Sequence, residues 1–281
     1  GICDFIVNLH HLPDQIEAYL TATYGASCSF TISREEEILG TGGGIRRVRH
    51  LLEMEPVFFV ANADTVQWPP VGEAVHALDT QRAIASLVLR HPPQGDRYTA
   101  VYAAAGRVSG IGSGAGEALM FSGAHAISSR IFNHLPDRDF SGITEDVYIP
   151  LLRNGREPIA AVVHDGLWFD IGTPARFVEA SHVVRRAILD GSVSLPGGSR
   201  IEASPALIVG DGAVVSDGTH ESVVGGSSQI APDAEVDRSI LFDRATVGAR
   251  CRVRDSIVAN DVDLPPGTTV EGMLVSRRLG D

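Results

Sequence analysis

Apolar runs and helix-periodic segments alternate along the first two thirds of the chain. Residues 57–61 are five apolar residues in a row, the pattern of a strand buried on both faces. Further strands are predicted at 4–8, 29–33, 83–90, 118–121 and 159–163, a hairpin at 98–111 that turns at Ala105 and Gly106, and helices from about 13, 45, 128, 144 and 174. This alternation predicts an α/β domain with a Rossmann-like, mainly parallel sheet.

The last quarter of the chain repeats with a step of 17 residues. Similar tripeptides begin at Ser222, Ser239 and Ser256, and apolar residues recur about six positions apart, as in a hexapeptide β-helix. The apolar positions that keep the step, and that we expect to point inward, are Ile230, Val236, Val247, Val253, Leu264 and Val270. About three coils are too few to stand alone, so the α/β domain or a second subunit is expected to cover them.

The two patterns are separated by a segment rich in proline, glycine and serine. We therefore predict an α/β domain at 1–190, a linker at 191–206 and a β-helix at 207–281.

The charge of the chain restricts what it binds. Its net charge of −12 argues against nucleic-acid partners, which need clustered cations. It contains no lysine, so phosphate contacts must come from arginine, backbone N–H groups or a metal ion. No apolar run approaches the roughly 20 residues of a membrane helix, and the three cysteines have no metal-like spacing. We expect a cytoplasmic protein without a membrane partner.

Two aspartates are candidates for a metal site. Asp170 lies between an apolar segment and the helix that begins after Thr173 and Pro174, where it either caps the turn or acts as a working carboxylate. Asp64 follows the buried strand at 57–61, at the carboxyl end where open α/β sheets bind ligands. If the two share a cation, their carboxylates should lie within about 5–6 Å of each other.

Glycines mark two further candidate positions. Gly42 and Gly43 stand with their neighbours before a helix, where backbone N–H groups can face an anionic or flat ligand, although a tight turn also explains one or two glycines. Gly123 follows a strand, so either a bulge or a substrate passing close to the backbone accounts for it.

Five segments together resemble the sugar-phosphate nucleotidyltransferases (NDP-sugar pyrophosphorylases) that carry a left-handed β-helix tail. They are residues 7–13, 39–43, 62–64, 121–123 and 168–174, and they span nearly the whole chain. Among these enzymes, the mannose-1-phosphate guanylyltransferases and related uridylyltransferases are the most similar. The resemblance implies that the tail is a left-handed β-helix that follows a nucleotidyltransferase domain.

The resemblance also implies a reaction. A nucleoside triphosphate and a sugar 1-phosphate would combine to an NDP-sugar and pyrophosphate, with Asp64 and Asp170 as catalytic residues that hold Mg²⁺. The implied nucleotide-binding residues are Thr41, Gly42, Gly43 and Asn62, and the implied sugar-binding residues are Gly123 and Glu145. Glu145 can equally be an ordinary acidic residue in the first turn of its helix. We also expect a homo-oligomer that forms through or beside the β-helix.

The chain departs from the family in two ways. The glycine-rich loop with an arginine and the Pro-Lys pair that hold the triphosphate are both absent, and the family's Asn-Gly-Asp is Asn62-Ala63-Asp64. We therefore expect the 281-residue chain as given to be inactive. The alternative is a regulatory or scaffolding subunit of the same fold without catalysis. An acyltransferase on the β-helix is a third hypothesis, for which His220 is the tail's one candidate base.

Overall fold

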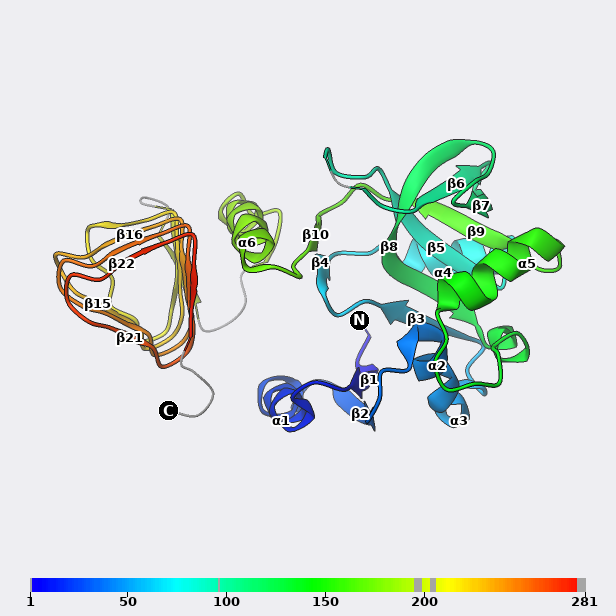
Figure 1. The fold of residues 1–281 in the computed structure, drawn as a ribbon, viewed down its shortest axis with the longest axis horizontal. Helices are drawn as coiled ribbons and strands as arrows, with labels where there is room; N and C mark the ends of the chain where they lie inside the picture. Colours follow the sequence, from blue (N-terminus) through cyan, green and yellow to red (C-terminus); the bar gives the residue numbers. More distant parts are fainter. Residues whose placement is uncertain (1, 96, 195–198, 203–205, 277–281) are drawn as a thin grey trace. The chain divides into compact units, whose positions relative to one another are not determined.

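The computed structural model describes residues 2–95, 97–194, 199–202 and 206–276. Packing contacts divide the chain into two units (Figure 1). The α/β unit comprises Gly1–Asn62 and Trp68–Gly166, and the β-helix unit comprises Ala63–Gln67 and Leu167–Asp281. Helix α6 (Pro174–Leu189) therefore belongs with the β-helix, and not with the α/β domain as the predicted boundary at 190 has it.

The α/β unit is built on a six-stranded sheet. In spatial order its strands are β3 (Val57–Ala61), β8 (Glu117–Ser128), β5 (Ala85–Arg90), β9 (Ile159–Val163), β7 (Arg107–Ile111) and β6 (Ala100–Ala104). Strands β3, β5 and β9 share one direction, as the α/β pattern predicts, but β8 lies antiparallel between β3 and β5. The α/β class is confirmed, and this sheet is mixed rather than mainly parallel. Strand β8 also pairs antiparallel with β6, the first strand of the hairpin that precedes it.

Smaller elements surround this sheet. A separate parallel pair is formed by β1 (Asp4–Leu9) and β2 (Ser29–Arg34), joined by α1 (Pro13–Tyr24). The remaining helices are α2 (Gly40–Arg47), α3 (Arg49–Leu52), α4 (Val71–Thr80), the 3-10 turn η1 (Ser129–Asn133), the π-helical turn η2 (Thr144–Tyr148) and α5 (Ile149–Asn154). The hairpin is confirmed, with positive φ at Ala105 and Gly106.

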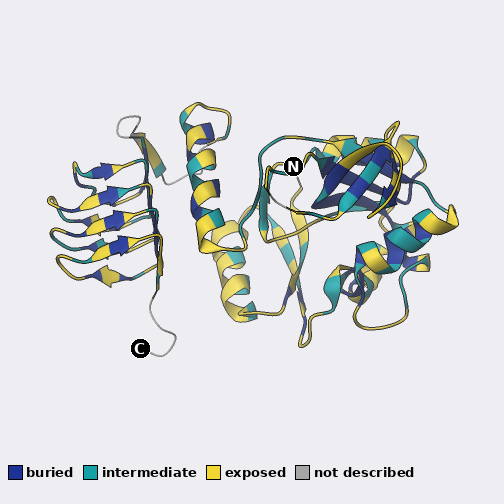
Figure 2. Cartoon of the chain, turned by 45° about the horizontal axis from the view of Figure 1, so that its top comes forward, coloured by how far each residue is buried: buried dark blue, intermediate teal, exposed yellow. Residues whose placement is uncertain are grey.

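The tail is a β-helix with three faces, which are visible end-on in Figure 1. Its strands are β12 (Leu207–Gly210), β14 (Val223–Val224), β17 (Ile240–Leu241), β20 (Ile257–Val258) and β23 (Leu274–Val275) on one face; β13 (Thr219–His220), β16 (Glu235–Asp237), β19 (Arg252–Arg254) and β22 (Thr269–Glu271) on the second; and β15 (Gln229–Ile230), β18 (Thr246–Val247) and β21 (Asp263–Leu264) on the third. Residues 17 apart pair in parallel, and all six predicted inward positions are buried, as Figure 2 shows for the strands.

The predicted linker contains a strand. Residues Ser199–Glu202 form β11, which pairs antiparallel with β12, because its backbone groups find partners at the first edge of the β-helix. Positions 195–198 and 203–205 of the predicted linker lie outside the described residues.

A serine ladder explains the serine that begins each repeat. The Ser222 hydroxyl accepts a hydrogen bond from the N–H of Ser239 at 3.0 Å, and the Ser239 hydroxyl accepts one from Ser256 at 3.2 Å. These serines are buried, so their hydroxyls must find partners inside the protein. The ladder fastens each coil to the next.

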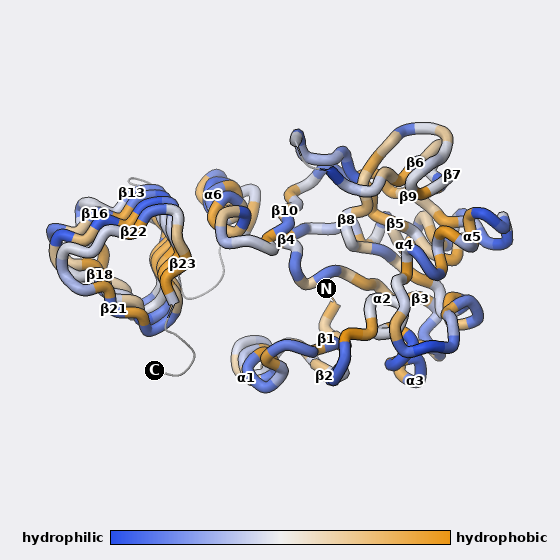
Figure 3. Tube along the Cα trace, in the orientation of Figure 1, coloured by the Kyte–Doolittle hydropathy of each residue, from blue (hydrophilic) through white to orange (hydrophobic). Residues whose placement is uncertain are grey.

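Helix α6 covers one face of the β-helix. Val223, Ile240 and Ile257 point outward from that face and pack against Phe177 and Val178 of α6. Figure 3 shows the face as an orange, hydrophobic column beside α6. The expected cover was the α/β domain or a second subunit, but this face is buried by a helix of its own unit. Apolar residues of this face point both into the β-helix and outward, so the outer side must also be shielded from water.

The packing of α6 on this face predicts that two equivalent positions of the face contribute differently to stability. Ile257 is 5% exposed beneath α6, whereas Leu274, one coil further, is 48% exposed. Ile257→Ala should lower the unfolding free energy of the β-helix unit by about 2–4 kcal/mol, and Leu274→Ala by less than about 1 kcal/mol. Urea unfolding, followed by Trp168 fluorescence in a Trp68→Phe background, measures both. Equal losses would contradict the described packing.

Candidate functional site

Two short strands bring Asp64 and Asp170 together in the β-helix unit. Strand β4 (Thr65–Gln67) pairs antiparallel with β10 (Trp168–Asp170), so that Asp170 lies opposite Thr65. The N–H of Ile171 donates to the carbonyl oxygen of Asp64 at 3.1 Å. The two aspartates are more than a hundred residues apart in sequence. The pairing of β4 with β10 makes their backbones neighbours in space. The expected carboxylate separation stays a prediction.

Asp170 makes two contacts of its own. Oδ1 accepts a hydrogen bond from the N–H of Gly172 at 2.9 Å, and Oδ2 lies 2.5 Å from Nη1 of Arg176. The side chain of Thr173 accepts from the N–H of Arg176 at 3.3 Å, so Thr173 is the N-cap of α6, as predicted. The hydrogen bond from Gly172 to Asp170 supports the interpretation of Asp170 as a residue that caps this turn. Asp64 is exposed.

The donor set suits a magnesium ion that is also held by its substrate. Mg²⁺ prefers oxygen ligands and often takes only one or two carboxylates, with phosphates and water completing its shell. Asp64 and Asp170 supply that number, and each Asp170 oxygen has a second lone pair beside its present contact. Among the described residues, no group of three or more His, Cys, Asp or Glu is placed to hold a metal.

The glycine stretch of the α/β unit packs against a loop. The N–H groups of Gly42 and Gly43 donate to the carbonyl oxygen of Ser141 at 2.9 and 3.2 Å. A Cβ at Gly42 would lie 2.6 Å from the Ser141 hydroxyl, and one at Gly43 would collide with the carbonyl of Asp139. The lack of space for a side chain thus explains why these two residues are glycines. Their N–H groups were expected to face a ligand, but they donate to the protein's own backbone. Thr41 is exposed beside them.

A matched pair of glycines tests this packing. Gly43→Ala is expected to lower the unfolding free energy of the α/β unit by about 2 kcal/mol or more, because the methyl group has no room beside Asp139. Gly72, in helix α4, has nothing within 4 Å of its Cβ position, so Gly72→Ala should be neutral or stabilising by up to about 1 kcal/mol. Urea unfolding that gave both variants the same stability would refute the contact.

Asn62 and Gly123 are brought together at the end of β3. The N–H of Asn62 donates to the carbonyl oxygen of Gly123 at 3.0 Å. Gly123 has φ +83°, and a Cβ there would lie 2.8 Å from the Asn62 amide nitrogen. The register of β8 against β5 shifts around this point, which is a bulge. Of the two explanations for Gly123, the bulge is thus present, and its sugar contact stays a prediction.

Glu145 lies in the π-helical turn η2 and is exposed. Its neighbour Asp146 accepts a hydrogen bond from the N–H of Gly142 at 2.8 Å and pairs with Arg138. Arg138, and then the Gly142 N–H, lower the pKa of Asp146. Glu145 is thus an acidic residue of the first turn, as its ordinary interpretation has it, and its sugar contact stays a prediction. Such π-helical turns are frequent at functional sites.

A buried pair links β8 to η2. The Tyr148 hydroxyl lies 2.8 Å from Nδ1 of His125, and both side chains are almost fully buried. Burial lowers the pKa of His125 to about 3 and raises that of Tyr148 well above its ordinary value. Sequence reasoning missed this pair. The sequence signal is a histidine between two alanines in a mostly apolar strand, two residues after Gly123.

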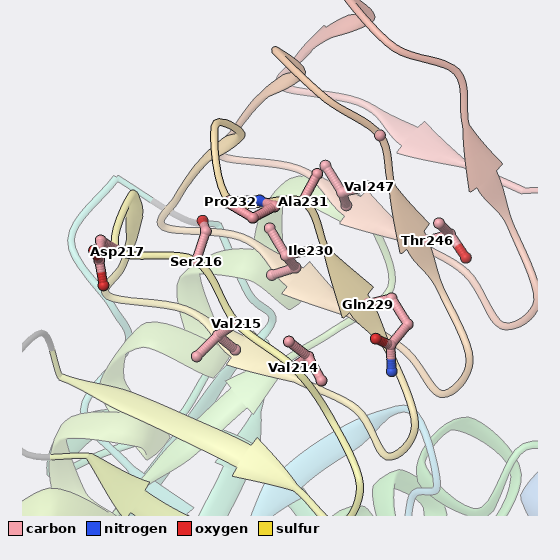
Figure 4. A pocket seen from close by; sticks show the side chains of 11 residues that line it. Val214, Val215, Ser216, Asp217, Gln229, Ile230, Ala231, Pro232, Thr246 and Val247 are labelled. Atoms are coloured by element: carbon pink, nitrogen blue, oxygen red, sulfur yellow. The ribbon is translucent and has the colours of Figure 1, made fainter.

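A cavity of about 450 Å³ opens on the β-helix (Figure 4). It is lined by residues 214–217, 229–232 and 246–248, which do not include His220. The acyltransferase hypothesis, which needs a base at such a site, gains no support from it.

None of the helices in the described part of the chain is long and apolar enough to cross a membrane.

Comparison with known proteins shows what the two parts of the chain are similar to. Residues 202–273 match the family model described as GlmU-like, C-terminal hexapeptide, which confirms the predicted hexapeptide β-helix. Sequence relatives over most of the chain are sugar-1-phosphate nucleotidyltransferases, as the resemblance predicts.

Two such relatives cover most of the chain. The mannose-1-phosphate guanylyltransferase of Mycobacterium tuberculosis is 26% identical, over 89% of this chain and 70% of that enzyme. The UTP–glucose-1-phosphate uridylyltransferase of Synechocystis is 22% identical, over 92% and 76%. The solved structure of HddC from Yersinia pseudotuberculosis, also known in complex with GMP-PN, shares the fold, with a TM-score of 0.53 and 21% identity over 64% of this chain and 78% of that chain.

Proposed function

We propose that this protein transfers a nucleotidyl group from a nucleoside triphosphate to a sugar 1-phosphate, which yields an NDP-sugar and pyrophosphate. The observation that carries the proposal is the pairing of β4 with β10, through which Asp64 and Asp170 become neighbours. The similarity to mannose-1-phosphate guanylyltransferase and glucose-1-phosphate uridylyltransferase supports it. Neither relative determines which base or sugar this chain takes.

In this reaction an oxygen of the sugar phosphate attacks the α-phosphorus of the triphosphate. Both groups are anionic, so catalysis consists mainly of positioning and charge neutralisation. Asp64 and Asp170 would hold Mg²⁺, which when bound supplies positive charge to the phosphate oxygens. The hydrogen bond from Gly172 keeps the Asp170 carboxylate oriented.

The α/β unit would bind the rest of the substrates. We assign the nucleotide to Thr41, Gly42, Gly43 and Asn62 and the sugar to Gly123 and Glu145. Because the N–H groups of Gly42 and Gly43 are engaged by Ser141, Thr41 is the member of that stretch that can offer a hydrogen-bonding side chain. The exposed carboxylate of Glu145 can accept hydrogen bonds from sugar hydroxyls.

Pyrophosphate release tests the proposal. The protein as its gene encodes it is incubated with Mg²⁺, each of four nucleoside triphosphates, and mannose or glucose 1-phosphate. At least one combination should release pyrophosphate and form the matching NDP-sugar in equal amounts. The 281-residue chain, which has no lysine, is expected at the background rate. Tight binding of an NDP-sugar without any turnover by the gene-encoded protein would favour the regulatory or scaffolding alternative.

We further propose a cytoplasmic homo-oligomer whose contacts lie at or beside the β-helix. The stack leaves Met273 and Leu274 of its last described coil exposed, and such apolar ends favour association. Light scattering after size exclusion should give a mass above that of one chain. Deletion from Ala206 onward should lower that mass or the melting temperature, and a truncated protein unchanged in both would contradict this assignment.

A further inference from the structure

Arg176 occupies an unfavourable place for a cation. It is the third residue of α6, whose first turn contains no acidic side chain. The N-terminus of a helix carries partial positive charge, so acidic residues are stabilising there and an arginine is not. A residue that opposes this local preference invites a functional explanation.

The ion pair that Arg176 makes is not required by the fold. Its Nη1 lies 2.5 Å from Oδ2 of Asp170, and the two side chains are 37% and 34% exposed. Half-buried pairs that remain this accessible to solvent contribute on the order of 1 kcal/mol to stability. The turn and the helix are already capped by the hydrogen bonds of Gly172 and Thr173.

The charge composition points to a role with phosphate. Without lysine, arginine side chains are the permanent cations available to a phosphorylated substrate. A guanidinium group presents several N–H donors in a fork that fits phosphate oxygens. Arg176 holds this group at the very carboxylate assigned above to the metal ion.

We propose that Arg176 is a phosphate-binding residue that rests on Asp170 when no phosphate is present. When the substrate arrives, the guanidinium exchanges the carboxylate for phosphate oxygens, and the Oδ2 atom of Asp170 becomes free. The inference rests on the proposed function and extends it. The phosphate belongs to the sugar 1-phosphate or to the triphosphate, and the two arms of the test separate these sources.

Calorimetric titration tests the exchange. The gene-encoded protein is titrated with mannose 1-phosphate or glucose 1-phosphate in one arm and with GTP or UTP in the other, both with Mg²⁺. Arg176→Gln should weaken binding in at least one arm by roughly 10- to 100-fold, as expected for the loss of a charge-assisted hydrogen bond. Arg176→Lys, which keeps the charge, should restore part of the affinity. The melting temperature should not fall.

Arg244 provides the matched control. It forms an exposed Arg–Asp pair in the same unit, with Nε 2.6 Å from Oδ1 of Asp261. Arg244→Gln should leave both affinities unchanged. If the wild-type protein binds the ligands and Arg176→Gln binds them equally well, the role of Arg176 is refuted while the proposed function stands. If Arg176→Gln lowers both affinity and melting temperature, and Arg176→Lys restores neither, the role of Arg176 is structural and the inference is overturned. If the wild-type protein binds none of the ligands, the proposed function fails first.

Discussion

Asp170→Asn should reduce nucleotidyl transfer by at least about 100-fold, with little loss of stability. Removing a group that organises charge at the reacting phosphates costs on the order of 10²–10³ in rate. The asparagine Oδ1 can still accept the hydrogen bond from Gly172, so the turn should persist, and the lost pair with Arg176 is worth about 0–1 kcal/mol. Pyrophosphate release and thermal unfolding measure the two effects.

Asp261→Asn is the matched control, because it breaks an exposed Arg–Asp pair elsewhere in the same unit. It should leave turnover unchanged. If Asp170→Asn unfolds the β-helix unit but retains turnover in the folded fraction, the carboxylate is a cap and not a catalytic group.

Acidification should destabilise the α/β unit through His125. Its folded-state pKa of about 3 lies below the value of about 6.5 in the unfolded chain. Between these values the unfolded chain binds a proton that the folded protein does not. The contribution is fully present above pH 6.5 and is lost as the pH falls, by about 1.4 kcal/mol for each pH unit. From pH 7 to pH 5 the loss should be about 2 kcal/mol.

His125→Gln isolates this effect. Glutamine can accept a hydrogen bond from the Tyr148 hydroxyl but does not titrate, so the variant should lose less stability on acidification, whatever its stability at pH 7. The carboxyl groups of Asp146 and Asp165, whose pKa values are also lowered, contribute in both proteins and cancel in the difference. Trp68, in a Trp168→Phe background, reports unfolding of the unit. Identical pH slopes would contradict the assignment.

Local chemistry made much of the fold predictable from sequence. The 17-residue step fixes which residues of the β-helix point inward, and all six predicted positions are buried. Thr173 followed by Pro174 predicts the start of α6, because a cap depends on a few neighbouring atoms. The neighbouring placement of Asp64 and Asp170 followed from motif resemblance, and the β4–β10 pairing supplies its structural cause.

Contacts between distant segments were not predictable in this way. The insertion of β8 between β3 and β5 and the carbonyl of Ser141 on Gly42 and Gly43 depend on how remote segments meet. The cover by α6 did leave a signal. In Val223-Val224 and its repeats both neighbouring residues are apolar, which indicates that both sides of the strand are buried. The cation in the first turn of α6 is a comparable signal for Arg176.

We propose that β4 and β10 place Asp64 and Asp170 at one divalent cation. Paramagnetic broadening by Mn²⁺ in the amide NMR spectrum tests it most directly, with and without a nucleoside triphosphate. The amides of Asp64, Thr65, Asp170 and Ile171 should broaden first, at one equivalent of metal or less, and Asp64→Asn or Asp170→Asn should each abolish the effect. Broadening centred elsewhere, or broadening at these amides that survives both substitutions, would contradict the account.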